Sequence, residues 1–349
     1  MRIHELLNNT SLRIDRPAGE SDFEMTDLVD DSRRVEPGAG FVCRAGAGGG
    51  DVGKLVRDAA ERGAAAVFVE HGEAGAAEAA LEAVAAMSHG SVGESGRAGV
   101  PLLRLERLTQ AEAGELAEAF FGRPAEKLQS VGITGTNGKT TTAWLVRQLL
   151  RGAGRKPALL GTIETDLGEP GGPLASDLTT PGAVELSRML ARAVAAGCDS
   201  LVMEVSSHAL HQGRAAAMRF DAAVFTNLTG DHLDYHGTME NYAAAKALLF
   251  ESLRESSWAI VNADDPWVDR MVRDCRAKLL GTAMRPPRDE EPQRAEGVTI
   301  PVRAWVEPLS MRSDGSRARF HGPWGSLELE LPLVGMHNLS NALQALAAA

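Results

Sequence analysis

The stretch Val131-Gly132-Ile133-Thr134-Gly135-Thr136-Asn137-Gly138-Lys139-Thr140-Thr141-Thr142 carries the strongest signal in the chain. It continues an apolar run that begins at Leu128 and predicts a short buried strand, and it leads into apolar residues at helical spacing. Closely spaced glycines between the two predict a tight turn. This order is typical of a phosphate-binding loop, because the unpaired N–H groups at a helix start point at a bound anion. We therefore expect a nucleotide here, with Lys139 near its phosphates and the Thr140 hydroxyl on Mg²⁺. We call residues 134–140 the phosphate loop.

One position departs from the strict pattern G-x-x-x-x-G-K-[ST], which requires glycine where this chain has Ile133. The alternative is a glycine-rich turn between a strand and a helix, with an exposed lysine and no ligand. The strand before the turn and the helix after it favour nucleotide binding.

Composition limits the remaining possibilities. The chain has 349 residues, which predicts two or three domains, and its Ala- and Gly-rich, aromatic-poor content suits an α/β protein. A net charge of −11 without a basic block argues against a nucleic-acid partner. No apolar run has the length of a membrane span, and the N-terminus has no apolar signal core. Cys43, Cys198 and Cys275 are far apart, which predicts free thiols in a reducing cytoplasm.

Residues 1–125 are expected to form a first, small α/β domain, because strand-like and helical patterns alternate there. A turn-rich loop at 31–38 and a glycine-rich loop at 46–51 interrupt the pattern. Residues 71–98 predict a surface helix and a loop without chemistry.

Residues 126–349 are expected to form the central domain. Strand-like runs at 158–160, 200–205, 222–226 and 258–262 alternate with helical patterns, notably 182–196 and 239–254. This spacing predicts a mostly parallel sheet covered by helices, with ligands beyond the carboxyl ends of its strands. Alternating residues in 297–334 predict an accessory antiparallel sheet, and a last helix begins near Asn338. The chain stops inside that helix, so we expect it to be cut from a longer protein.

Polar residues follow several of these strands. Glu204 ends one strand and is suited to Mg²⁺, although a surface glutamate is the plainer interpretation of that residue alone. The segment 227–236 concentrates Asn, Asp and His after a buried strand, which favours a site over an ordinary polar loop. Lys246, taken alone, reads as a solvated lysine, and Thr179 and Thr180 as caps of the helix that follows.

These pieces resemble one family, the Mur ligases, and within it the MurE type, the UDP-N-acetylmuramoyl-L-alanyl-D-glutamate amino-acid ligases. The motifs that carry the resemblance are the phosphate loop, Asp177-Leu-Thr-Thr-Pro181, Met203-Glu-Val-Ser-Ser-His-Ala-Leu210 with Gln212 and Arg214, Phe225-Thr-Asn-Leu-Thr-Gly-Asp-His-Leu-Asp-Tyr-His-Gly237, Tyr242 to Phe250, Asn262-Ala-Asp-Asp265 and Gly335-Met-His-Asn-Leu-Ser-Asn341. The resemblance also accounts for Ile133, because the family's own loop reads Thr-Gly-Thr-Asn-Gly-Lys.

The resemblance implies a role for each motif. Thr140 and Glu204 would hold one Mg²⁺, and His232 with a carbamylated Lys246 (N6-carboxylysine) a second. The residues implied for ATP binding are Gly135, Thr136, Asn137, Gly138, Lys139, Thr140, Thr141, Asn338 and Asn341. The residues implied for the UDP-N-acetylmuramoyl-dipeptide are Thr179, Thr180, Ser206, Gln212 and Arg214, with Ser32 on the uridine diphosphate. The glycines at 46–50 stand where the family commonly has a His-Asp-Gly type sequence.

The activity implied is the ATP-dependent addition of a third amino acid to the muramoyl-dipeptide through an acyl phosphate, in peptidoglycan synthesis. That activity serves cell wall biogenesis, cell shape, cell division and the cell cycle. The amino acid would be meso-diaminopimelate, otherwise L-lysine, and we expect a cytoplasmic monomer. The family has a C-terminal domain that binds the amino acid, and we expect this chain to lack it and to be inactive alone.

Three alternatives remain open. A ligase like folylpolyglutamate synthase shares the fold and the acyl-phosphate chemistry, but its loop typically reads Gly-Lys-Gly-Ser. A non-catalytic UDP-sugar-binding module would need no metal set, whereas Glu204, His232 and Lys246 are all present. A phosphate-loop kinase or GTPase would need a guanine motif or a phosphoryl acceptor site, and neither is evident.

Overall fold

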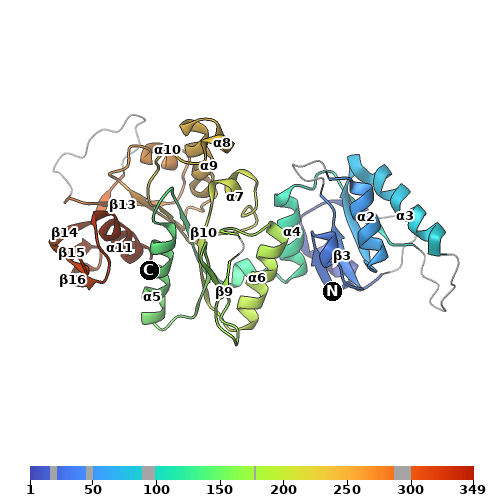
Figure 1. Cartoon of the computed structure of the whole chain (residues 1–349), viewed down its shortest axis with the longest axis horizontal. Helices are drawn as coiled ribbons and strands as arrows, with labels where there is room; N and C mark the ends of the chain where they lie inside the picture. Colours follow the sequence, from blue (N-terminus) through green and yellow to red (C-terminus); the bar gives the residue numbers. More distant parts are fainter. Residues whose placement is uncertain (16–21, 45–49, 89–98, 177, 287–299) are drawn as a thin grey trace. The chain divides into compact units, whose positions relative to one another are not determined.

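The computed structural model describes residues 1–15, 22–44, 50–88, 99–176, 178–286 and 300–349. The chain divides into two compact units, Met1–Pro124 with Gly182–Arg188, and Ala125–Pro181 with Met189–Ala349 (Figure 1). The predicted α/β class is confirmed in both. Most of the glycine-rich loop at 46–51, part of the predicted loop before residue 99, and Asp177 lie outside the described residues. No helix in the described ranges is both long and apolar enough to cross a membrane.

The first unit has a five-stranded sheet in the order β1-β5-β4-β3-β2. Its strands β2 to β5 are parallel, and β1 pairs antiparallel with β5. The strands are β1 (Ile14–Asp15), β2 (Asp27–Val29), β3 (Ala39–Val42), β4 (Ala66–Glu70) and β5 (Leu102–Leu105). The helices are α1 (Ile3–Asn9), α2 (Val52–Glu61), α3 (Ala74–Ser88) and α4 (Gln110–Phe120), with short η1 (Ser32–Arg34) and η2 (His71–Glu73).

Alternation along the strands builds two cores on the two faces of this sheet. Phe68 on β4 packs in one cluster with α1 and α4 residues, while its neighbour Val67 packs in another with α2 and α3 residues. Successive side chains of a strand point to opposite faces, so buried strands need apolar residues at every position.

The second unit has an eleven-stranded sheet in the order β16-β15-β14-β13-β12-β11-β6-β10-β7-β8-β9. In this spatial order the seven strands β14, β13, β12, β11, β6, β10 and β7 are parallel to one another, which confirms the prediction of a mostly parallel sheet. The strands are β6 (Gln129–Thr134), β7 (Pro157–Leu160), β8 (Glu164–Asp166), β9 (Leu174–Ala175), β10 (Ser200–Glu204), β11 (Ala222–Phe225), β12 (Trp258–Asn262), β13 (Lys278–Ala283), β14 (Val302–Arg312), β15 (Gly315–Gly322) and β16 (Gly325–Leu331). The helices are α5 (Lys139–Gly152), α7 (Ser207–His211), α8 (Leu233–His236), α9 (Met239–Glu251), α10 (Val268–Val272) and α11 (Met336–Ala348), with short η3 (Pro124–Lys127). Helix α6 (Ala183–Ala195) is divided between the units, because its residues up to Arg188 are assigned to the first.

The predicted antiparallel strands are present as β14, β15 and β16, and they belong to the central sheet. Strand β14 pairs parallel with β13, so they extend the central sheet at one edge. The short strands β8 and β9, which the sequence pattern did not reveal, extend it at the other edge.

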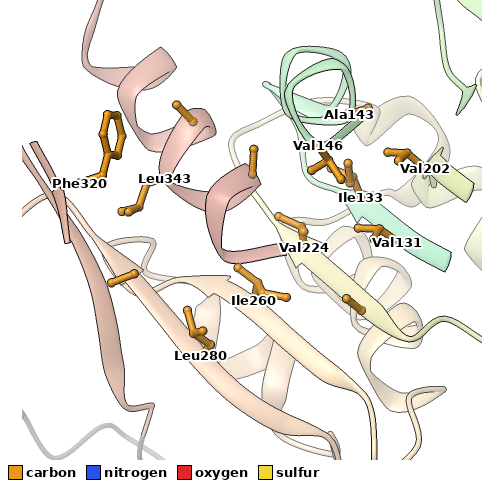
Figure 2. Packing of buried hydrophobic residues seen from close by; sticks show 14 of the residues in the cluster. Val131, Ile133, Ala143, Val146, Val202, Val224, Ile260, Leu280, Phe320 and Leu343 are labelled. Carbon is orange, nitrogen blue, oxygen red and sulfur yellow. The ribbon is translucent and has the colours of Figure 1, made fainter. Parts of the chain in front are cut away.

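The core beneath the phosphate loop explains the residue that departs from the strict motif. Ile133 is fully buried and packs with Val131, Val146, Val224 and the last helix, α11, as Figure 2 shows. Strand β6 has a partner on each side, β10 and β11, and its residues from Ser130 to Thr134 are all buried. A glycine at 133 would remove a whole side chain from this core, whereas the loop makes its turn two residues later.

Candidate functional site

Two glycines give the phosphate loop its shape. Gly138 caps α5 with a φ of 86°, and Gly135 has a φ of 149°; L side chains rarely adopt either conformation. A side chain at Gly135 would overlap the Thr226 hydroxyl, and one at Gly138 would overlap the Asn341 amide oxygen. The loop therefore packs closely against the segment after β11 on one side and against α11 on the other.

The segment after β11 holds the phosphate loop through hydrogen bonds. The Asn137 carbonyl accepts from Thr226 Oγ1 at 2.6 Å and from Asn227 Nδ2 at 2.9 Å. The Thr136 N–H donates to the Asn227 carbonyl at 2.8 Å, and the Asn137 N–H to Asn227 Oδ1 at 3.1 Å. No role was expected for Thr226 or Asn227 individually, although they stand in the quoted motif directly after a buried strand.

Two lysines meet at one carbonyl oxygen of the loop. Lys139 Nζ donates to Gly135 O at 3.0 Å and to Thr136 O at 2.9 Å, and Lys246 Nζ donates to the same Gly135 O at 2.9 Å. Burial lowers the pKa of Lys139, against the opposing effect of Glu204 and Asp231. The two hydrogen bonds hold Lys139 Nζ at the point where a helix start already favours anions.

Lys246 is buried, so the solvated-lysine interpretation is wrong. Its side chain lies on α9 with 1% of the residue exposed, and the face of the Tyr242 ring is 4.6 Å from Nζ. Burial, and next the charge of Lys139, hold the pKa of Lys246 well below its ordinary value. A lowered pKa increases the share of the free amine, which is the nucleophilic form.

Glu204 is also buried, with 1% exposed, so the surface-glutamate interpretation is wrong. Its Oε2 accepts from the Thr140 hydroxyl at 3.1 Å and from the Thr162 hydroxyl at 3.0 Å, and Oε1 accepts from the Thr162 N–H at 2.9 Å. A hydroxyl and a carboxylate oxygen this close are the ligands that Mg²⁺ prefers. In the part of the chain that the structure describes, no three His, Cys, Asp or Glu side chains form a metal site by themselves. That donor set fits Mg²⁺ that takes its remaining ligands from phosphates and water.

His232 lies at the start of α8 in the left-handed conformation, with a φ of 51°. Its ring is 4.9 Å from the His208 ring and 6.2 Å from the Tyr242 ring, between centroids, and half of its side chain is exposed. Non-glycine residues rarely adopt this backbone, and such strain is commonly found at functional sites. The structure thus places His232 beside Tyr242, whose ring face also lies against Lys246 Nζ.

Apart from Ser32, the residues expected on the acceptor substrate form one hydrogen-bonded group. The Thr180 hydroxyl donates to the Glu204 carbonyl at 3.0 Å and accepts from the Ser206 N–H at 3.1 Å. Arg214 donates to the Thr180 carbonyl at 3.1 Å and, at 2.9 and 2.6 Å, to Gln212 Oε1. The Thr179 hydroxyl lies 3.1 Å from that of Thr162. The Thr179 and Thr180 hydroxyls thus bond to Thr162 and Glu204 at strand ends, whereas the sequence alone favoured capping of the following helix.

Asn338 and Asn341 lie on the first turns of α11. Asn341 is buried beside Gly138, its Nδ2 donates to Asn338 Oδ1 at 3.3 Å, and Asn338 Nδ2 donates to the Val334 carbonyl at 2.9 Å. Thr141 follows in the first turn of α5. The set expected for ATP is therefore collected at one end of the sheet.

Ser32 belongs to the first unit, where it is buried at the start of η1. Its hydroxyl donates to Asp58, and this hydrogen bond is the main cause that lowers the pKa of Asp58.

Three residues for which no role was expected contact the expected site residues of the second unit. Thr162 follows β7 and contacts Glu204 and Thr179. Tyr242 is buried, and its hydroxyl lies 3.2 Å from Thr136 Oγ1. Tyr235 accepts from Gln212 Nε2 at 3.2 Å. The two tyrosines stand in quoted motifs, so their position was a usable signal, whereas nothing in the sequence singles out Thr162.

Comparisons with known proteins show which family this chain is similar to. Residues 133–349 match the family described as Mur ligase middle domain. The chain is 37% identical over 340 residues to the UDP-N-acetylmuramoyl-L-alanyl-D-glutamate–2,6-diaminopimelate ligase of Bacillus licheniformis, covering 95% of this chain and 61% of that protein. It is 38% identical over 353 residues to the protein of the same name from Synechococcus elongatus, covering 100% of this chain and 64% of the relative.

A solved structure of a UDP-N-acetylmuramoyl-L-alanyl-D-glutamate–2,6-diaminopimelate ligase has a similar fold. The TM-score is 0.68 at 26% identity, and the match covers 93% of this chain and 59% of the other. The chain thus spans about three fifths of the length of the proteins that it resembles.

Proposed function

This chain belongs to the Mur ligase family, and as a homologue of its MurE type we propose that it carries the nucleotide and acceptor sites of an ATP-dependent amide ligase. The acceptor would be UDP-N-acetylmuramoyl-L-alanyl-D-glutamate and the added group a third amino acid, in the synthesis of peptidoglycan. Relatives named as 2,6-diaminopimelate ligases favour meso-diaminopimelate over L-lysine.

One observation carries the proposal: Lys139, Thr140, Glu204, His232 and Lys246 converge at the carboxyl ends of β6, β10 and β11. Four of these side chains are hydrogen-bonded to one another or to one carbonyl oxygen at about 3 Å, and a carboxylate and an amine among them are buried. Burying two ionisable groups costs stability unless their surroundings compensate, so the arrangement is typical of a reaction site.

At the phosphate end, Lys139 and the N–H groups at the start of α5 would bind the phosphates of ATP. Thr140 Oγ1 and Glu204 Oε2 would hold Mg²⁺. When bound, Mg²⁺ supplies the positive charge that lets a carboxylate approach a triphosphate, and ATP supplies the phosphoryl group that makes that carboxylate an electrophile. The part of the chain is to hold both reactants in line and to exclude water.

Lys246 would complete the cation-binding group in a modified form. Its uncharged amine can add to CO₂, forming a C–N bond as the nitrogen releases a proton, and the resulting carbamate offers anionic oxygens. An ammonium would repel Mg²⁺, whereas a carbamate and the His232 imidazole attract it. The buried, low-pKa amine supports this proposal.

At the acceptor end, Arg214 would offer its guanidinium to a carboxylate of the dipeptide. Its orientation is fixed by Gln212 and by the Thr180 carbonyl, so little side-chain entropy is lost on binding. Thr179 and Ser206 would supply hydroxyl groups, and Ser32 in the first unit would contact the uridine diphosphate. We further propose that the working protein is a cytoplasmic monomer.

Calorimetric titration of this chain tests the proposal. UDP-N-acetylmuramoyl-L-alanyl-D-glutamate should bind, and binding should be lost in Arg214→Met but kept in Arg276→Met, which changes an arginine outside the site. A folate substrate serves as the rival ligand. Binding of the folate and not of the muramoyl-dipeptide would show a folylpolyglutamate-synthase-like ligase instead.

A further inference from the structure

The turn after β7 wraps around the Glu204 carboxylate. Gly161 lies so close that a side chain there would come within 2.7 Å of Glu204 Oε1. The next residue, Thr162, then bonds both carboxylate oxygens, with its N–H on Oε1 at 2.9 Å and its hydroxyl on Oε2 at 3.0 Å. One residue thereby fixes both the position and the rotation of a buried carboxylate.

Counting hydrogens gives the direction of these bonds. A carboxylate only accepts, so the single proton of the Thr162 hydroxyl is committed to Glu204. The Thr179 hydroxyl, 3.1 Å from Thr162 Oγ1, must then donate its own proton to Thr162. The chain of donors runs from Thr179 through Thr162 to Glu204, and it leaves Oε2 facing the Thr140 hydroxyl at 3.1 Å.

We infer that Thr162 is a positioning residue for the cation site, one that touches the carboxylate and not the cation. This rests on the proposed function, because it takes Thr140 and Glu204 as the Mg²⁺ ligands. When a cation binds, the Thr140 hydroxyl must turn its oxygen toward it and release Oε2, whereas both Thr162 bonds can stay in place. Glu204 is then already oriented, so the cation does not bear the cost of ordering it. Groups that orient a metal ligand in this way commonly change metal affinity by about 10- to 100-fold when replaced.

Metal affinity, measured without turnover, tests the inference. Mn²⁺ replaces Mg²⁺ as the probe, and free Mn²⁺ is followed by electron paramagnetic resonance while the chain is titrated in the presence of ADP. Thr162→Val keeps the shape and the N–H bond but loses the hydroxyl, and it should weaken Mn²⁺ binding by about 10-fold. Thr162→Ser restores the hydroxyl and should recover most of the affinity. The matched control is Thr165→Val on β8, which should bind as the unsubstituted chain does.

Each outcome decides something. Equal Mn²⁺ affinity in the unsubstituted chain, Thr162→Val and Thr162→Ser would overturn the inference and leave the cation site standing. Equal losses in Thr162→Val and Thr165→Val would show a general effect on the fold and would also overturn it. Absence of Mn²⁺·ADP binding by the unsubstituted chain would remove the cation site and with it the inference. The muramoyl-dipeptide titration reports separately on the acceptor end.

Discussion

Lys139 and Lys246 donate to the same oxygen atom, the carbonyl of Gly135, at 3.0 and 2.9 Å. One lysine opens α5 and the other lies within α9, so the phosphate loop brings together two amines that are far apart in the sequence. Two ammonium groups at this separation repel each other strongly in a buried site. The lowered pKa of Lys246 follows from its burial and from this neighbour.

Removing Lys139 should raise the pKa of Lys246. In Lys139→Met the positive neighbour is absent, so the ammonium form of Lys246 is less destabilised, although burial still opposes it. The rate at which cyanate modifies Lys246 at neutral pH, read by peptide mass spectrometry, should fall because less free amine is present. Lys278→Met, on β13, is the control and should leave the rate unchanged. An unchanged rate in Lys139→Met would show that the two amines do not interact.

Gly138→Ala should destabilise the chain and abolish nucleotide binding. The left-handed backbone alone costs about 1–2 kcal/mol for a residue with a Cβ, and the new methyl group also overlaps the Asn341 amide oxygen. Gly152→Ala, at the other end of the same helix, is the control. Nothing lies within 4 Å of the methyl group there, so helix propensity predicts a gain of about 0.5–1 kcal/mol. Chemical denaturation and ADP titration check both, and a fully stable, ADP-binding Gly138→Ala would contradict the account of the loop.

Replacing Gln344 on α11 by an apolar residue of the same length should stabilise the chain. It is fully buried, and neither atom of its amide has a hydrogen-bond partner within the described ranges. A buried polar group without a partner costs roughly 1–3 kcal/mol. Gln344→Met keeps the length of the side chain and should raise the free energy of unfolding by about 1 kcal/mol. Gln344→Ala should lower the free energy of unfolding, because it opens a cavity. The prediction would be contradicted if Gln344→Met lost as much stability as Gln344→Ala.

The chain should lose stability as the pH falls from about 7 to 5. Burial lowers the pKa of His208 and of His236, and cationic neighbours lower both further, although Asp234 opposes this shift at His208. A histidine in an unfolded chain titrates near about 6.5. Below that pH the unfolded state therefore binds more protons than the folded state, and stability declines toward the lower, folded pKa values.

His236→Gln tests this dependence because glutamine can keep a hydrogen bond to Ser207 Oγ, which His236 Nε2 meets at 3.0 Å. The melting temperature of this variant should change less between pH 7 and pH 5 than that of the unsubstituted chain. His337→Gln, an exposed position at the start of α11, should keep the original dependence. The same slope in all three proteins would contradict the assignment to His236.

Sequence reasoning reached the elements whose signal is local. The strand and helix around the phosphate loop and the parallel run of strands follow from periodicity, and Glu204 and His232 stand at strand ends or in polar clusters. The burial of Lys246 had a signal that was not used, since its helix carries no other charge from Tyr242 to Phe250. A lysine amid apolar residues on every side of a helix is expected to be buried.

Other features depend on contacts that no local pattern contains. Thr162 is one of many threonines, and only the pairing of β7 with β10 brings it to Glu204. The continuity of the sheet depends on the pairing of β13 with β14, in which Gly281 lies beside Val302. The departure at Ile133 likewise becomes understandable only with the core that α5 and α11 form over β6.

The central claim is that the phosphate end and the acceptor end form one ligase site. A crystal structure of the chain with Mg²⁺, a non-hydrolysable ATP analogue and UDP-N-acetylmuramoyl-L-alanyl-D-glutamate tests it most directly. We expect the terminal phosphate at Lys139, a cation on Thr140 and Glu204, and the D-glutamate carboxylate facing that phosphate beside His232 and a carbamylated Lys246. A dipeptide whose carboxylate lies away from the phosphate, with an unmodified Lys246 still bonded to Gly135 O, would contradict it.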